Sequence, residues 1–381
     1  MTSESAMEGL RTTVMEDGLC TGCGACVNLC PYFTNYRDRT VILHRCDQAE
    51  GACREVCPRT PTDLTALSRV LFEPKDLTPE AGAIKDFLIT RAADDSVREK
   101  AQHGGTVTAL MSLALEEGLV DTAVLAGEGE RFLPAGVGVD DPGQVLDRAK
   151  SSFVVSPTLA AVNSLAQRDS GRLGVVATPC QALALAKMKK SDLVKVRAIA
   201  HKVSLVIGLF CGWAFDWRGL KAILEQKTDL AGIIKLDIPP SRYHFLVVET
   251  REGDLEIPLD QVTDCVRTSC GFCSDLTAEF SDISVGSARL PEGWAEAKGW
   301  NQVIVRTETG RELLALAKRR KRLEFRPVPP GNLDRLKKAA AKKKREAAAS
   351  LEARSGRPGD LGSASAGAEA LPDPTPQTKG D

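Results

Sequence analysis

Residues 20–31 read CTGCGACVNLCP, a run with four closely spaced thiols. The spacing C-x2-C-x2-C-x3-C-P is typical of iron–sulfur binding, in which three thiolates hold one cluster and the fourth reaches a companion cluster. Gly22 and Gly24 permit the tight turns that this wrapping requires. The run therefore predicts one-electron transfer. The alternative is a structural zinc site, but zinc modules use separated cysteine pairs.

A second half follows as CDQAEGACREVCP and ends with the same C-x3-C-P spacing. If the two halves exchange ligands in the usual way, each cluster draws cysteines from both. The second site lacks a thiol, because Glu50 stands where a middle cysteine is expected, with Asp47 nearby. We therefore expect a cluster there that is three-iron, oxygen-ligated or loosely held. The expected ligands are Cys20, Cys23, Cys26 and Cys57 for the first cluster, and Cys30, Cys46 and Cys53 for the second.

Four more cysteines occupy loops that could meet at one edge of a sheet. Cys180 follows the apolar run LGVVATP, Cys211 follows VSLVIGLF, and Cys270 and Cys273 form a C-x2-C before DISVGS. In open α/β sheets, ligands bind beyond the carboxyl ends of the strands. The four thiols are thus a candidate third cluster site. A lone Cys180 or Cys211 would more often be a buried apolar residue.

Residues 102–111, QHGGTVTALM, place two glycines before an expected helix. Bare glycine backbone at a helix N-terminus can approach a phosphate closely, and Thr106 and Thr108 add hydroxyl donors. Alone this signal is weak, because paired glycines more often form an ordinary turn or cap.

The organisation along the chain predicts an α/β fold. A small ferredoxin-like iron–sulfur module covers residues 16–64, and a proline-containing connector covers 65–83. From residue 84, short apolar runs alternate with helical patterns, which argues for a largely parallel sheet. After Leu230 the pattern is richer in strands and predicts a subdomain or an extension of the sheet. Residues 333–381 form a tail, first Lys/Ala-rich and read as a solvated helix, then disordered.

Composition excludes several classes of function. Lys and Arg number 50 against 51 Asp and Glu, and only 5% of residues are aromatic, so we expect no nucleic-acid partner. No apolar run approaches the length of a membrane span. The first residues lack the features of a secretory signal, so we expect reduced thiols and a cytoplasmic protein, free or peripheral on a membrane complex.

Six ordered motifs between about residues 84 and 320 resemble the beta subunits of coenzyme F420-reducing hydrogenases and F420H2 dehydrogenases. They are QHGGTVTALM, RAKSSFV, ATPCQALAL, GLFCGW, CGFCSDLTAEFSDISVGSA and WNQVIVRTETGRELL. Members with a ferredoxin-like N-terminal extension resemble the chain over about residues 16–320. The resemblance implies family regions at 84–150 and 151–328, which form a flavin-binding α/β domain.

The resemblance also implies one FAD and a cluster held by Cys180, Cys211, Cys270 and Cys273, although Cys265 could replace one of these ligands. The residues that would line the FAD site are His103, Gly104, Gly105, Thr106, Thr108 and Lys150, with Thr178, Pro179 and Gln181 close by. The expected cofactors are therefore FAD and two or three [4Fe–4S] clusters, one of which could be three-iron.

The implied activity is hydride exchange between FAD and coenzyme F420, or another hydride carrier such as a nicotinamide, followed by single-electron transfer. The expected partners are other redox subunits of a hydrogenase, dehydrogenase or quinone-linked complex. We assign no catalytic side chain, because this scheme requires no acid or base. Two alternatives remain: a free-standing flavin reductase of an organic substrate, and a non-enzymatic iron–sulfur relay.

Overall fold

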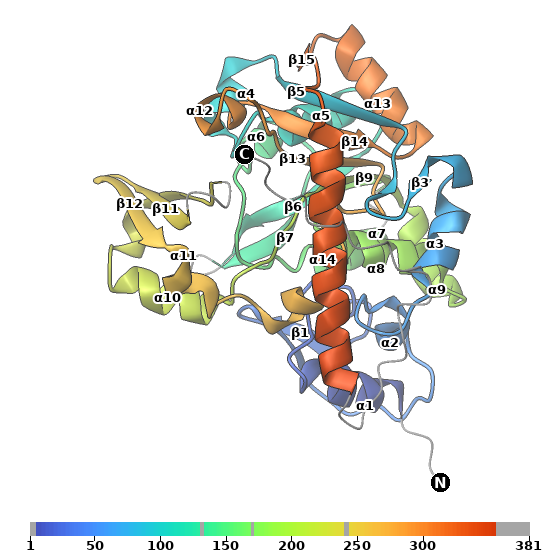
Figure 1. Ribbon diagram of the computed structural model, residues 1–381. Coiled ribbons are helices and arrows are strands. Elements are labelled where there is room, and N and C mark those ends of the chain that lie inside the picture. The colour runs from blue at the N-terminus through green and yellow to red at the C-terminus, as the bar shows by residue number, and fades with distance from the viewer. Residues whose placement is uncertain (1–4, 130–132, 169–170, 240–243, 356–381) are drawn as a thin grey trace, which may run out of the picture.

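A computed structural model describes residues 5–129, 133–168, 171–239 and 244–355 of the chain (Figure 1). Its described part contains a cysteine-rich N-terminal segment, an eight-stranded sheet with helices on both faces, a separate three-stranded sheet and a long C-terminal helix. None of the described helices is both long and apolar enough to cross a membrane.

The N-terminal segment has little regular structure. Helix α1 (Ala6–Leu10) continues into a π-helical turn (Arg11–Met15), an antiparallel hairpin joins β1 (Phe33–Tyr36) to β2 (Arg39–Ile42), and helix α2 (Ala52–Val56) follows. The cysteines lie mostly in the connecting loops.

The first cysteine loop is packed against helix α7 (Thr158–Gln167). Gly24 has a φ of +84°, and a Cβ there would lie 2.7 Å from the backbone of Pro157 and Ala160, so only glycine fits. The buried Asn163 amide donates to the carbonyls of Ala25 and Val27 at 2.9 and 2.8 Å. These bonds satisfy loop carbonyls that helix α7 removes from water.

The central sheet has the order β15-β5-β14-β13-β9-β8-β6-β7. Strands β6, β8, β9 and β13 form parallel neighbours, while β7, β14 and β15 pair antiparallel with theirs. The predicted parallel arrangement is therefore confirmed for the centre of the sheet, whereas its outer strands make the sheet a mixed one. The strands are β5 (Asp86–Ala92), β6 (Thr122–Glu128), β7 (Pro134–Val139), β8 (Leu173–Ala177), β9 (Val203–Leu209), β13 (Ile283–Ser287), β14 (Asn301–Val305) and β15 (Leu323–Arg326).

Helices cover both faces of this sheet, and each face has its own apolar core. Successive residues of β6 alternate between the two cores: Val124 belongs to one, and Ala123 and Leu125 to the other. The first core is completed by α7, α8 (Pro179–Lys190) and α9 (Val194–His201). The second is completed by α5 (Thr106–Glu116), α6 (Pro142–Leu146) and α13 (Glu308–Arg319). Two short helices, α4 (Asp95–Lys100) and α12 (Trp294–Ala297), lie in loops of the same sheet.

The strand-rich region after Leu230 divides between two sheets. Strands β10 (Ile233–Asp237), β11 (Phe245–Thr250) and β12 (Gly253–Pro258) form a separate antiparallel sheet, whereas β13 and β14 join the central one. Helices α10 (Trp217–Glu225) and α11 (Leu259–Thr263) pack with the small sheet around the buried Phe215 and Leu246. Both readings, a subdomain and an extension of the sheet, are therefore partly right.

The predicted connector is more structured than its prolines indicate. It contains helix α3 (Leu64–Leu71), whose N-terminus is capped by the Asp63 carboxylate, a 3-10 turn (Pro74–Asp76), and a two-stranded sheet of β3 (Leu77–Thr78) and β4 (Gly82–Ala83).

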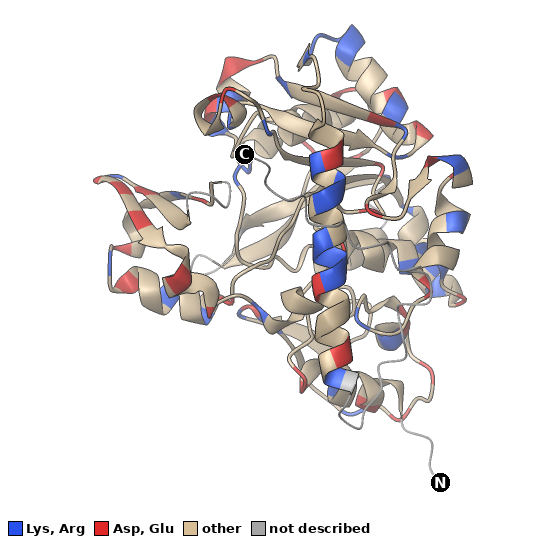
Figure 2. Ribbon diagram, in the orientation of Figure 1, with Lys and Arg blue, Asp and Glu red and all other residues tan. Residues whose placement is uncertain are grey.

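Helix α14 (Asn332–Ser355) runs from the central sheet to the N-terminal segment (Figures 1 and 2). The predicted helix is confirmed, but a fully solvated helix is wrong, because Leu336, Ala340 and Ala347 are buried against the body of the protein. The Ala/Lys bias concealed this docking because small alanines can pack closely without a conspicuous apolar stripe. The tail predicted to be disordered, from residue 356 on, lies outside the described residues.

Candidate iron–sulfur and flavin site

The structure brings Cys20, Cys23, Cys26 and Cys57 together around one small cavity. Burial raises the pKa of the Cys26 thiol well above its usual value, and the neighbouring Cys20, Cys23 and Cys57 raise it further. Burial likewise raises the pKa of Cys57 to about 11. The backbone N–H of Arg59 donates to the Cys57 sulfur and partly opposes this rise. A metal bound among these thiols would favour their ionised form, because metal ligation requires the thiolate.

The second group contains Cys30, Cys46 and Cys53. Burial raises the pKa of Cys53 to about 11, and the charges of Cys30 and, more weakly, Cys46 also raise it. The three cysteines therefore lie near one another. Asp47 and Glu50, the oxygen ligands considered from the sequence, are both exposed. The fourth ligand of this group stays a prediction.

Cys180, Cys211, Cys270 and Cys273 converge, as the strand-end positions of the first two and the C-x2-C of the last two predict. Cys180 lies in the first turn of α8, directly after β8, and Cys211 lies just after β9. The C-x2-C belongs to a 3-10 turn (Thr268–Phe272) and the residue that follows it. Burial raises the pKa of Cys211, and the charges of Cys270, Cys180 and Cys273 raise it further. Their role as cluster ligands stays a prediction.

Cys265 is separate from these groups. It packs with Phe215, Leu220 and Val262 in the core of the small sheet, and the charges that raise its pKa after burial are those of Asp216 and Asp264. Within the described residues, no three His, Cys, Asp or Glu side chains are arranged to hold a single metal ion.

Two arginines join the N-terminal cysteine group to the Cys270 loop. Arg59 donates from Nη1 to the Phe272 carbonyl at 2.7 Å and from Nη2 to the Ser269 carbonyl at 2.8 Å. In the opposite direction, Arg267 donates to the carbonyls of Cys20 at 3.2 Å and Asp38 at 3.1 Å. The Nε atoms of both arginines are buried and unpaired among the described residues.

The two cysteine groups that these arginines join are neighbours. After burial, the charge of Cys180 is the largest influence raising the pKa of Cys23. Neither arginine was singled out from the sequence. The sequence signal was weak: Arg59 comes two residues after Cys57, and Arg267 three residues before Cys270. Most isolated arginines are solvated, so neither position indicated a structural role.

The predicted flavin loop lies between β5 and α5. Gly105 has a φ of +77° and forms the N-cap of α5. A Cβ on Gly104 would lie 2.8 Å from Oδ1 of Asn301, which accepts a hydrogen bond from the Thr106 N–H. The Thr106 hydroxyl is fully buried and bonded to Thr90 at 2.9 Å, so it supports the loop from beneath.

His103 lies in a mostly buried site at the start of this loop. Burial lowers its pKa to about 4, Asp237 opposes that shift, and Lys235, Arg289 and Lys298 reinforce it. Its ring meets the edge of Trp294 at 5.4 Å between centroids. Its Nε2 atom is buried and lies 3.7 Å from Oδ1 of Asp237, without a hydrogen-bond partner among the described residues.

The remaining predicted flavin residues lie on α5, on the loop after α6 and at the start of α8. Thr178 and Gln181 form a capping box around Pro179 at the start of α8, and Gln181 also donates to the Ser156 carbonyl at 2.7 Å. Lys150 is exposed, and the next residue donates its N–H to Gln102 at 3.4 Å. Thr108 is buried on α5. A shared flavin site for these residues stays a prediction.

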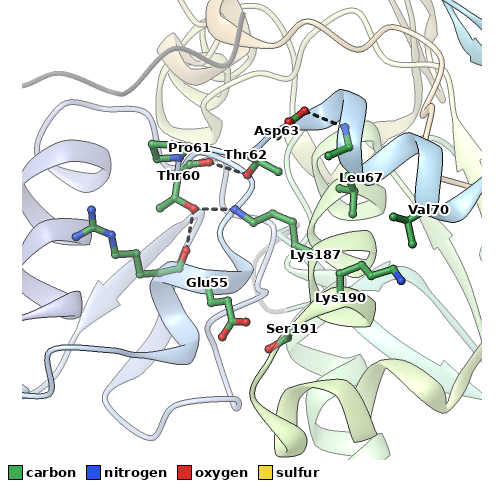
Figure 3. Close-up of a pocket in the computed structure, with 12 residues that line it drawn as sticks. Glu55, Thr60, Pro61, Thr62, Asp63, Leu67, Val70, Lys187, Lys190 and Ser191 are labelled. Carbon is green, nitrogen blue, oxygen red and sulfur yellow. Dashed lines mark hydrogen bonds between the residues drawn. The ribbon is translucent and has the colours of Figure 1, made fainter. Parts of the chain in front are cut away.

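A cavity of about 630 Å³ lies elsewhere, between the N-terminal segment and helices α3 and α8 (Figure 3). None of the residues predicted for FAD lines it. Lys187 reaches from α8 to the Cys57 carbonyl at 2.7 Å and to the Thr60 hydroxyl at 2.8 Å. Burial lowers the pKa of Lys187 to about 8.

Comparison with known proteins agrees with this fold. One chain of the F420-reducing [NiFe] hydrogenase complex from Methanosarcina barkeri superposes with a TM-score of 0.67 at 29% identity, covering 73% of this chain and 94% of that one. The beta subunit of the coenzyme F420 hydrogenase of Methanothermobacter thermautotrophicus is 30% identical over 280 residues, covering 72% of this chain and 96% of the relative. A subunit of the F420H2 dehydrogenase of Methanosarcina mazei is 25% identical over 325 residues, covering 83% of this chain and 87% of the relative.

These relatives define the class as subunits of oxidoreductases. The family model for the N-terminal region of the coenzyme F420 hydrogenase/dehydrogenase beta subunit matches residues 87–163, and the model for its C-terminal region matches 170–330. The chain belongs to the family of coenzyme F420 hydrogenase/dehydrogenase beta subunits.

Proposed function

We propose that the chain exchanges a hydride between bound FAD and coenzyme F420 and exchanges single electrons with a partner redox complex through iron–sulfur clusters. The observation that carries the proposal is the convergence of Cys180, Cys211, Cys270 and Cys273 beside the N-terminal cysteine group. The names of its relatives, which include subunits of an F420 hydrogenase and of an F420H2 dehydrogenase, support the choice of F420.

The chemistry of the thiols fits iron–sulfur clusters. Cysteine thiolate is the protein ligand of such clusters, and each quartet draws its members from separate loops. The quartets are Cys20, Cys23, Cys26 and Cys57, and Cys180, Cys211, Cys270 and Cys273. Burial raises the pKa of Cys26 and Cys211, one thiol from each quartet, so iron binding would release protons from them.

The residues around His103 fit an anionic ligand such as FAD. Lys235, Arg289 and Lys298 surround the histidine and would bind phosphate, while the unpaired Nε2 would hydrogen-bond the ligand. Because burial keeps the imidazole neutral at pH 7, His103 would act as a positioning residue without adding charge. Bound FAD would accept electrons as a hydride and release them one at a time.

Arg59 and Arg267 would hold the two cysteine quartets in a fixed relation. Each guanidinium reaches across from one cysteine-bearing segment to backbone carbonyls of the other. Their positive charge would also stabilise thiolate and sulfide nearby. Their buried Nε atoms remain available for such contacts.

The proposal is tested by anaerobic purification with quantitation of iron, sulfide and flavin, followed by reduction with F420H2, NADH and NADPH in parallel. We expect bound FAD and flavin bleaching by F420H2. Bleaching by NADH or NADPH but not by F420H2 would make a nicotinamide the hydride donor. Bleaching coupled to reduction of an added organic acceptor would favour a free-standing reductase. Iron–sulfur clusters without flavin would favour the non-enzymatic electron relay. Zinc without iron would overturn the proposal.

A further inference from the structure

Helix α14 lies beyond residue 330, where the family match ends, yet it is docked over the cysteine loops. Nζ of Lys343 donates to the Cys211 carbonyl at 2.6 Å. Arg354 lies over the ring of Phe272, the residue directly before Cys273. It also forms an ion pair with Asp17 of the N-terminal segment. The helix therefore lies close to both cysteine groups.

The docked face of α14 is held by buried polar contacts as well as by Leu336, Ala340 and Ala347. Lys344 forms an ion pair with the mostly buried Glu279 at 2.6 Å. Burial raises the pKa of Glu279 to about 7, and Lys344 opposes the shift. These contacts fix the rotation of the helix about its axis.

The opposite face carries a row of exposed cations at i, i+3, i+7 and i+10: Arg335, Lys338, Lys342 and Arg345. Figure 2 shows the basic side of the helix as a blue band near its middle. Lys342 has a carboxylate of Glu346 at 3.6 Å, whereas Lys338 and Arg345 form no ion pair within the described part of the chain. The row lies on the outer side of a helix whose docked side contacts Cys211 through Lys343, so its position is fixed.

We propose that this basic row is the docking surface for a small acidic protein that carries a one-electron redox centre. The proposal rests on the proposed function, since it names the partner that exchanges electrons with the clusters. Lys343 connects the docking helix to the cysteine site, because it is hydrogen-bonded to the backbone of Cys211. An acidic carrier would be steered to this face by charge complementarity.

A protein fits the row better than a membrane does. Helices that lie in a membrane surface insert large apolar side chains beside their cations. Leu336, a large apolar residue of α14, is buried against the protein itself, and alanines accompany the exposed cations. The outer face thus offers charge without an apolar anchor.

The test measures binding of the full-length, cluster-loaded chain to an oxidised plant-type [2Fe–2S] ferredoxin by isothermal titration calorimetry. The variant combines Lys338→Glu, Lys342→Glu and Arg345→Glu. A matched control combines Lys195→Glu, Lys227→Glu and Arg251→Glu, which reverses three exposed cations elsewhere. Phosphatidylserine vesicles and a basic c-type cytochrome are titrated in the same way.

We expect Kd for the ferredoxin to rise by about tenfold or more in the α14 variant and to change little in the control, with the wild-type affinity falling between about 20 and 200 mM salt. Flavin reduction by F420H2 should be the same in all three proteins, so a failure of the proposed function would be seen separately. Equal affinity of the two triple variants, or wild-type binding to the vesicles or cytochrome but not to ferredoxin, would overturn the inference. Circular dichroism checks that the Glu variant is folded. If it is misfolded, a variant with Gln at the same three positions is used in its place.

Discussion

At the scale of single residues, the candidate site separates cysteines that look alike in the sequence. Cys180 and Cys265 are both partly or fully buried, and burial raises the pKa of each. The charges beside Cys180 are those of Cys273, Arg59 and Cys270, whereas those beside Cys265 are carboxylates. We infer that neighbours, more than burial, distinguish a ligand from a core thiol.

The first prediction concerns these two cysteines. Cys180→Ala should lower the iron content of the anaerobically prepared protein by about four atoms per chain, because one cubane loses a ligand. Cys265→Ala should leave iron and acid-labile sulfide unchanged. The measurement is elemental analysis with electron paramagnetic resonance of the reduced protein. Equal iron loss in both variants would contradict the assignment.

The second prediction concerns the protonation of His103 in the flavin-free protein. Its folded pKa, about 4, is below the usual value near 6.5, so the folded state binds fewer protons between these pH values. The free energy of unfolding contributed by this group therefore falls as pH drops from about 6.5 towards 4. NMR should find the imidazole neutral at about pH 6, and Asp237→Asn should lower its pKa further. A charged His103 at that pH would refute this.

At the scale of elements, a buried arginine connects three segments near the cysteine loop. Arg306, directly after β14, donates to the carbonyls of Ala81 and Ala83 at 2.7 and 2.8 Å. It also donates to the Ser284 hydroxyl at 2.7 Å and to Thr277. The connector, the loop after the C-x2-C and strand β13 thus depend on one side chain.

The third prediction is that Arg306→Met lowers the free energy of unfolding by about 3–5 kcal/mol, because several buried carbonyls lose their donor. Burial lowers the pKa of Arg306 to about 10, so it is charged at pH 7. The matched control is Arg311→Met, whose partner Glu308 is exposed, and it should change stability little. Denaturant titration compares the two variants.

The fourth prediction concerns the docking of α14. Because burial raises the pKa of Glu279 from 4.5 to about 7, the folded state binds more protons than the unfolded state between these values. The stabilisation linked to this group is therefore fully present below about pH 4.5 and is lost as pH rises through 7. Glu279→Gln should flatten that part of the stability profile, whereas the exposed Glu346→Gln should preserve it. A profile unchanged by Glu279→Gln would rule out this linkage.

At the scale of the whole molecule, the N-terminal segment and the central sheet behave as one unit in the structure. Helix α7 satisfies the carbonyls of the first cysteine loop, Arg59 and Arg267 cross in opposite directions, and α14 reaches Asp17. A ferredoxin-like extension attached by a flexible linker would have none of these contacts.

The fifth prediction follows from these crossings. Arg59→Met and Arg267→Met should each increase hydrogen exchange in residues 20–30 and weaken the magnetic coupling between clusters in the reduced protein, because the two segments lose shared hydrogen bonds. Arg39→Met removes another contact from the same segment, an exposed pair with Asp216 at 3.4 Å, and should do neither. Identical exchange in all three variants would contradict the proposed role.

The sequence by itself determined the features that depend on local order. The C-x2-C-x2-C-x3-C-P spacing, the alternation of strands and helices, and the strand-end positions of Cys180 and Cys211 are properties of neighbouring residues, and periodicity reports them directly. The family motifs indicated the same region that the family models match.

Only the tertiary structure decided which distant groups meet. It brought Arg59 to the Cys270 loop, separated Cys265 from the other cysteines, and divided the later strands between two sheets. It also turned a Lys-rich segment that reads as solvated into a docked helix. The physical reason is that burial and long-range hydrogen bonds depend on how the elements pack, and local spacing carries no information about residues more than a hundred positions apart, such as Arg59 and Phe272.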